Sequence, residues 1–85
     1  MPRRFPPLKL RELRAILEAR GFVCVRVDGS HQQWAGMWAG RPRVVTLDGK
    51  YDDIGGDILR SMIRQSGMTR DEFYESTPGT ARKIR

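Results

Sequence analysis

Residues 22–38 have the sequence FVCVRVDGSHQQWAGMW. The first six residues are rich in β-branched side chains and lead into Asp28-Gly29, a pair that favours a tight turn. The segment from His31 to Trp38 then has the length of a returning strand. On a strand, Trp34 and Trp38 share one face because they are four residues apart. The stretch therefore predicts an antiparallel β-hairpin.

Regular elements are expected on both sides of this hairpin. A turn at 39–42 is followed by a third strand at 43–47, where valine and threonine are frequent. Apolar residues at three- and four-residue spacing predict one helix between Leu8 and Gly21. The same spacing predicts a second helix from Asp57, its expected N-cap, to the residues before Gly67.

The resulting order is α-β-β-β-α, followed by a short helix capped by Thr69 and Glu72. This order predicts an α+β domain in which helices cover one face of a three-stranded antiparallel sheet. We expect a lead-in at residues 1–7, one domain at 8–75 and a disordered basic tail at 76–85.

The charge distribution is compatible with a polyanionic partner. Sixteen Lys and Arg residues oppose ten Asp and Glu residues, for a net charge of +6. Residues 9–43 and the two ends are basic, whereas residues 44–75 are acidic. Arginine predominates among the bases, and its guanidinium pairs bidentately with phosphate. Basic tails also occur on proteins that bind no nucleic acid, so charge alone leaves the partner open.

Composition excludes several classes of site. One cysteine and one histidine allow neither an internal disulfide nor a zinc site built from Cys and His. Four aspartates at 48, 52, 53 and 57 do not match the spacing of a calcium loop, which favours a solvated acidic loop over a magnesium site. We expect Cys24 to be buried as a small apolar residue among valines.

The sequence also indicates where the protein resides. Prolines and charges occupy the first thirteen residues, where a signal peptide would need an apolar stretch. The longest apolar run, residues 22–25, is too short to cross a bilayer. We therefore expect a cytoplasmic protein with no membrane partner.

Two features allow more than one interpretation. Gly55-Gly56 before the second helix could cradle a phosphate, but Asp57 would repel an anion there, so a simple turn is favoured. Trp34 and Trp38 could stack on nucleobases, whereas packing in the core or at a partner interface is the more ordinary use of tryptophan.

His31 is the residue best suited to chemistry. It follows a glycine turn, beside Ser30 and near Arg26. Imidazole titrates near neutrality, and RNA cleavage without metal needs a group that takes a proton from the 2′-hydroxyl and one that protonates the leaving 5′-oxygen. One histidine fills one of these roles at a time, so the other falls to water, to Lys50 or to an arginine. A surface or structural histidine is the alternative.

Three stretches, LEARGF at 17–22, VRVDGSHQQW at 25–34 and LRSMIRQSGMT at 59–69, resemble the HicA family in order and spacing. Members of that family are small toxins of toxin–antitoxin pairs that cleave mRNA. The resemblance extends from about Leu8 to Glu75.

The resemblance implies a double-stranded-RNA-binding-domain-like fold and a metal-independent endoribonuclease that needs no cofactor. It implies that the histidine of Gly-Ser-His, here His31, is catalytic. It also implies a HicB-type antitoxin that covers the active site in a hetero-oligomer. On this basis the expected RNA-binding residues are Arg26, Gly29, Ser30, Arg43 and Lys50.

The sequence departs from the family pattern at two places. Residues 46–50 replace a Pro-x-His motif of many members, and residues 57–59 replace Gly-Thr-Leu. The second departure removes groups expected to contact phosphate, so RNA is expected to meet the first half of the chain and the basic tails. Two other functions stay open: a non-catalytic RNA-binding module of this fold, and a protein-interaction domain that uses the tryptophans.

Overall fold

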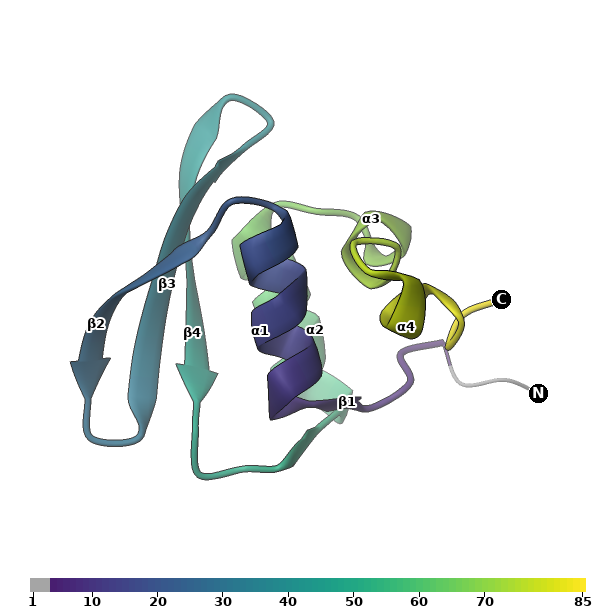
Figure 1. The fold of residues 1–85 in the computed structure, drawn as a ribbon, viewed down its shortest axis with the longest axis horizontal. Coiled ribbons are helices and arrows are strands. Elements are labelled where there is room, and N and C mark those ends of the chain that lie inside the picture. The colour runs from purple at the N-terminus through teal and green to yellow at the C-terminus, as the bar shows by residue number, and fades with distance from the viewer. Residues whose placement is uncertain (1–3) are drawn as a thin grey trace.

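The computed structural model describes residues 4–85, and in it a three-stranded antiparallel sheet lies beside a group of helices (Figure 1). Strands β2 (Val23–Asp28), β3 (His31–Trp38) and β4 (Arg41–Asp48) follow one another across the sheet. Helices α1 (Leu10–Ala19) and α2 (Gly56–Ser66) lie on the β4 side. The predicted α+β order and the double-stranded-RNA-binding-domain-like arrangement are confirmed.

Short elements complete the chain. Strand β1 (Leu8–Lys9) pairs with β5 (Asp53–Ile54), and two-residue strands of this kind leave no periodic signal in a sequence. Helix α3 (Arg70–Tyr74) begins with the predicted capping box, in which the Thr69 hydroxyl accepts the Glu72 N–H. Helix α4 (Pro78–Ala81) follows.

One face of the sheet packs on the helices. Trp34 of β3 lies opposite Val45 of β4, and both side chains are buried together with Leu47. Gly36 lies on the same face, where the Phe22 ring occupies the space that a side chain would need. The rest of this core comes from the helices and connections, chiefly from Leu13, Ile16, Leu17, Leu59, Met62, Ile63, Phe73 and Tyr74.

The opposite face of the sheet, here called the open face, is ordered in rows by the strand register. Residues directly opposite one another on paired strands point to the same side, and alternate residues point to opposite sides. The first row holds Asp28, His31 and Asp48; the second holds Arg26, Gln33 and Thr46; the third holds Val23, Ala35 and Val44; the fourth holds Met37 and Pro42.

Strand β2 is an exposed edge strand, which corrects one expectation. Cys24 is exposed rather than buried, as are all six residues of the strand. The pairing with β3 shifts between Cys24 and Arg26, which marks a β-bulge. A run of valines was a poor guide to burial because the helices pack beside β4 and leave β2 uncovered.

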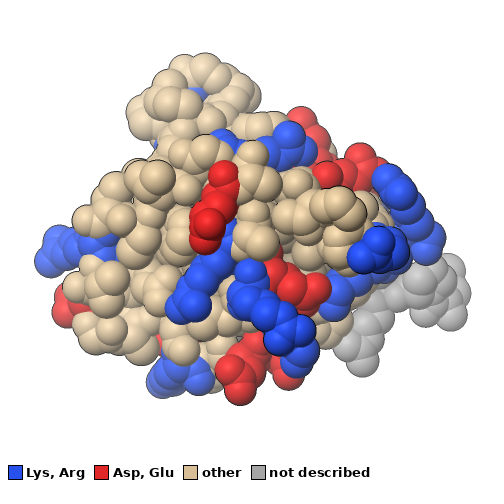
Figure 2. Space-filling model, in the orientation of Figure 1, with Lys and Arg blue, Asp and Glu red and all other residues tan. Residues whose placement is uncertain are grey.

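Charged side chains of both signs alternate over the face of the molecule shown in Figure 2. The projecting tip of the β3–β4 hairpin is largely uncharged in this view.

Helix α2 begins differently from the prediction, with Gly55 rather than Asp57 as its N-cap.

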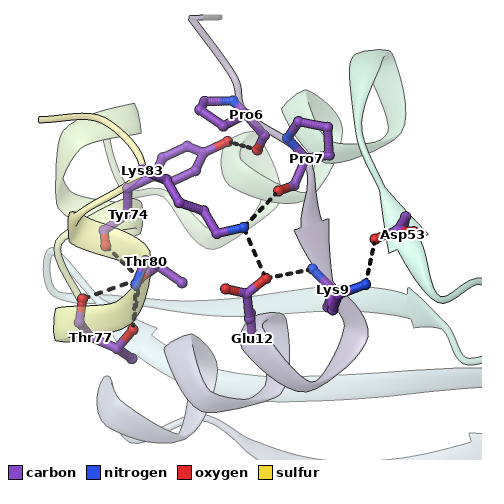
Figure 3. Close-up of polar contacts among 9 residues, drawn as sticks. All are labelled: Pro6, Pro7, Lys9, Glu12, Asp53, Tyr74, Thr77, Thr80 and Lys83. Atoms are coloured by element: carbon purple, nitrogen blue, oxygen red, sulfur yellow. Dashed lines mark hydrogen bonds and ion pairs between the residues drawn. The ribbon is translucent and has the colours of Figure 1, made fainter. Parts of the chain in front are cut away.

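The C-terminal residues pack on the domain, whereas a disordered tail was expected at 76–85. Thr80 is buried, and its hydroxyl donates to the Tyr74 carbonyl at 2.6 Å (Figure 3). Lys83 Nζ reaches the Glu12 carboxylate at 3.3 Å and the Pro7 carbonyl at 3.3 Å. The sequence did not predict these contacts, because they are made by single residues rather than by a periodic apolar face. The expected lead-in at 1–7 lies partly outside the described residues.

Within residues 4–85, no helix has both the length and the apolar character needed to cross a membrane.

Candidate active site

The β2–β3 turn presents His31 on the open face. The turn has two residues, Gly29 and Ser30, and it joins the paired residues Asp28 and His31. Gly29 has φ +61°, a left-handed conformation that glycine adopts without a steric penalty. The sequence predicted a tight turn at Asp28-Gly29, and the structure places the turn one residue later, because Asp28 is still paired with His31 at the end of β2.

Asp48 of β4 faces His31 from the other side. His31 Nε2 lies 3.7 Å from Asp48 Oδ2, which is ion-pair range when the imidazole is protonated. The imidazole is 61% exposed and the carboxylate 21% exposed. The anionic group is therefore the more sheltered of the two, and the imidazole stays open to a ligand.

The Asp48 carboxylate is held by its neighbours. Its Oδ1 accepts the backbone N–H of Lys50 at 3.2 Å. The hydrogen bond from the Ser30 side chain, the Lys50 N–H and the charges of His31 and Lys50 together outweigh burial and lower the pKa of Asp48 below its ordinary value of 3.8. Asp48 is thus ionised at neutral pH and can stabilise a positive charge on His31.

A pocket of about 350 Å³ opens beside this pair. Its lining consists of Arg26, Asp28, His31, Gln33 and Thr46. These side chains supply a guanidinium for a phosphate, an imidazole for proton transfer, and an amide and a hydroxyl able to donate and accept hydrogen bonds. Asp28 adds a carboxylate, so the pocket presents charges of both signs and suits a ligand that combines an anionic group with hydrogen-bond donors.

The structure brings together most of the predicted site residues. Arg26 lines the pocket with His31, and Gly29 and Ser30 form the adjoining turn. Lys50 lies just beyond β4, with its ammonium group 5.3 Å from the centre of the Tyr51 ring.

Arg43 lies elsewhere, because it follows the alternation to the helix-covered side of β4. Its Nε donates to the Trp38 carbonyl at 3.3 Å. Its guanidinium also lies against Gly67 at the end of α2, so close that a side chain on Gly67 would collide with it. Arg43 therefore joins the β3–β4 hairpin to α2 and does not reach His31.

Asp48 is the site residue that the sequence reasoning missed. A four-residue turn at 39–42 would have aligned Lys50 with His31. The actual turn is Ala39-Gly40, with φ of 54° and 76°, so Trp38 pairs with Arg41 and His31 with Asp48. Gly40 was the available signal for a two-residue turn, because such turns need a positive φ that glycine adopts readily. Pro42 did not exclude this turn, because proline is tolerated in an edge strand although it has no N–H to donate.

The acidic loop does not form one cluster. Asp53 pairs with Lys9 at 3.2 Å, and Asp57 lies 3.9 Å from Arg60. No three His, Cys, Asp or Glu side chains of the described residues gather in a way that could hold a metal ion. Trp34 is buried in the core, and Trp38 is partly buried against that core with the Arg20 guanidinium 5.0 Å from its ring centre, so both tryptophans contribute to packing of the domain.

Comparison with protein families agrees with this architecture. A family model described as "HicA toxin of bacterial toxin-antitoxin" matches residues 10–68, more than half of the chain. The chain belongs to the HicA toxin family. The matched segment extends from α1 to the residues after α2 and contains His31 and Asp48. Searches of curated proteins and of solved structures gave no match.

Membership of the HicA family implies an antitoxin partner, because these toxins belong to toxin–antitoxin systems. The segment that resembles the family's Gly-Ser-His motif lies on the open face of this HicA domain. The Gly-Ser-His segment forms the β2–β3 turn and the start of β3, at the edge of the pocket.

Proposed function

We propose that this HicA family member is a cytoplasmic endoribonuclease that cleaves mRNA without a metal ion, with His31 as its general acid/base, acting as the base in the step that begins the reaction. The observation that carries the proposal is the position of the chain's only histidine. Its exposed imidazole borders a pocket with an arginine and faces an anchored, ionised carboxylate.

In the proposed reaction, the neutral imidazole of His31 takes the proton of a ribose 2′-hydroxyl. The 2′-oxygen then forms a bond to the adjacent phosphorus, and the bond from phosphorus to the 5′-oxygen breaks. A proton from water or a second group passes to the leaving 5′-oxygen. The products are a 2′,3′-cyclic phosphate and a 5′-hydroxyl, and Asp48 stabilises the imidazolium formed in the first step.

Arg26 and Lys50 are the proposed partners of the phosphate. Arg26 lines the pocket, and Lys50 is exposed and holds Asp48 through its own backbone N–H. The space around Gly29 is open, so an RNA backbone can approach the Gly29-Ser30 turn closely. We give Arg43 a structural role instead, because its guanidinium is engaged on the other side of the sheet.

The proposed protein partner is a HicB-type antitoxin, bound in a hetero-oligomer. Membership of the HicA family supports this partner. The His31 side chain is also exposed, so a toxin of this kind would act in its own cell unless another protein blocked the site.

The proposal is tested with an mRNA transcript and the same sequence carrying 2′-O-methyl groups. We expect the purified chain to cut the transcript to fragments with 2′,3′-cyclic phosphate ends and to leave the methylated RNA intact. Fragments with 3′-hydroxyl ends, or cleavage of methylated RNA, would show that the 2′-oxygen is not the nucleophile. Binding of both RNAs without cleavage would favour the RNA-binding module.

A further inference from the structure

The third and fourth rows of the open face form an apolar surface, defined by Val23, Ala35, Met37, Pro42 and Val44. Val23, Met37 and Val44 are 59%, 60% and 51% exposed, although valine and methionine are usually buried. The strand register sets Val23, Ala35 and Val44 directly side by side across all three strands. Exposed apolar residues that are contiguous in this way mark interaction sites.

This apolar surface adjoins the His31 pocket. The row between them holds Arg26, Gln33 and Thr46, and all three line the pocket. Rows of one face are about 7 Å apart along a strand. A partner seated on Val44 therefore lies within two rows, about 14 Å, of His31.

RNA is a poor match for the apolar surface. Nucleic acid is bound through cations that neutralise its phosphates and through aromatic rings that stack on its bases. The five residues of the apolar surface include neither. Aliphatic side chains gain most from contact with the apolar side chains of another protein.

Charge distinguishes between possible protein partners. The second, third and fourth rows contain one cation, Arg26, and no carboxylate; the carboxylates of Asp28 and Asp48 lie in the first row, on the other side of Arg26 from the apolar surface. A second copy of the chain would bring another net charge of +6 and another Arg26 to the same place. A partner with carboxylates beside its apolar contacts complements the surface instead.

We propose that the apolar surface is the docking site of the antitoxin, through apolar side chains flanked by acidic residues that meet Arg26. The proposal rests on the toxin part of the proposed function, because it needs an antitoxin, but it does not need RNA cleavage. Binding and cleavage can therefore fail independently.

The test compares Val44→Asp with Ile58→Asp in binding to the purified product of the reading frame beside the gene for this chain. Ile58 is a matched control, because it is apolar and 55% exposed but lies on α2. By titration calorimetry we expect Val44→Asp to weaken binding at least tenfold, because a charge within an apolar contact is left unpaired. Ile58→Asp should change the Kd less than twofold.

Val44→Thr and Met37→Gln are milder substitutions that test the same surface and are expected to preserve the fold. Both positions are exposed, and threonine retains the β-branch of valine. Each should weaken binding several-fold. Equal affinity for all variants, or no binding of the wild-type chain, would overturn the proposal. Self-association of the free chain that Val44→Asp abolishes would assign the surface to a second copy. Loss of RNA affinity in Val44→Thr would assign it to RNA.

Discussion

At the scale of single residues, the site depends on one imidazole and one anchored carboxylate. The sequence pointed to His31 as the candidate site residue through its resemblance to the HicA family, because a histidine after a tight turn is by itself also typical of a surface or structural residue. It did not identify Asp48, because the partner of His31 depends on whether the next turn has two residues or four. The register between β3 and β4 depends on the length of the turn that joins them. A register shift of two residues would put Lys50 instead of Asp48 opposite His31 and would leave every side chain on its predicted face.

Replacing Asp48 by Asn tests the role of this carboxylate. Asparagine keeps an acceptor for the Lys50 N–H but loses the charge that stabilises the His31 imidazolium. We expect kcat for RNA cleavage to fall about fivefold with little change in KM, as for the loss of a partly exposed ion pair.

Asp28→Asn is the matched control, because Asp28 pairs with His31 from β2 and lines the same pocket, whereas the ion pair is formed with Asp48. Its kcat should stay within twofold of the wild-type value. Equal losses in the two variants would show that the pocket responds to charge in general rather than to Asp48.

The lowered pKa of Asp48 also predicts a pH dependence of stability. The folded state binds this proton less readily than the unfolded state, so the stabilisation is present above pH 3.8 and is lost as the pH falls through the lowered pKa. Urea unfolding should therefore separate wild type from Asp48→Asn at pH 7, and the difference in unfolding free energy should shrink as the pH falls below 3.8. A difference that persists unchanged at pH 2 would mean that the side-chain charge is not the cause.

At the scale of elements, β3 joins the core to the site, because its even residues face the helices and its odd residues face outward. Alternation in the sequence was enough to predict that Trp34 and Trp38 share a face. It could not predict that the helices cover β4 and leave β2 exposed, because helix placement depends on packing with residues far along the chain. Gly36 allows the close approach of Phe22 that fixes this packing.

Gly36→Ala should destabilise the domain by about 1–3 kcal/mol, the usual cost of an overpacked core. The added Cβ would lie 2.6 Å from the Phe22 ring. Gly79→Ala on α4 is the control, because no atom lies within 4 Å of its added Cβ. Chemical unfolding of both variants checks the prediction, and a Gly36→Ala variant as stable as Gly79→Ala would contradict the packing of Phe22 on β3.

At the scale of the whole molecule, the N-terminal and C-terminal segments are held together on the side away from the sheet (Figures 1 and 3). The Tyr74 hydroxyl donates to the Pro6 carbonyl at 2.6 Å, and burial, partly offset by Arg70, raises the pKa of Tyr74 to about 12. Composition predicted loose ends because prolines and charges predominate there, but the contacts use backbone carbonyls that composition does not reveal.

Tyr74→Phe should cost about 1 kcal/mol of unfolding free energy, the net value of one hydrogen bond. In wild type, the raised pKa gives stability that is complete below pH 10 and is lost as the pH rises to about 12. Tyr74→Phe should lack this decline between pH 10 and 12. Urea unfolding at pH 8 and pH 11 provides the measurement, and parallel declines in the two proteins would contradict it.

Cleavage of RNA in the absence of free metal ions decides whether His31 acts without a metal ion. The purified chain and His31→Ala are incubated with an mRNA transcript in EDTA, after circular dichroism has shown that both are folded. We expect cleavage by wild type and a loss of at least about 100-fold in His31→Ala, the usual effect of removing a general acid or base. Equal cleavage by the two proteins, or none by wild type unless metal is added, would contradict it.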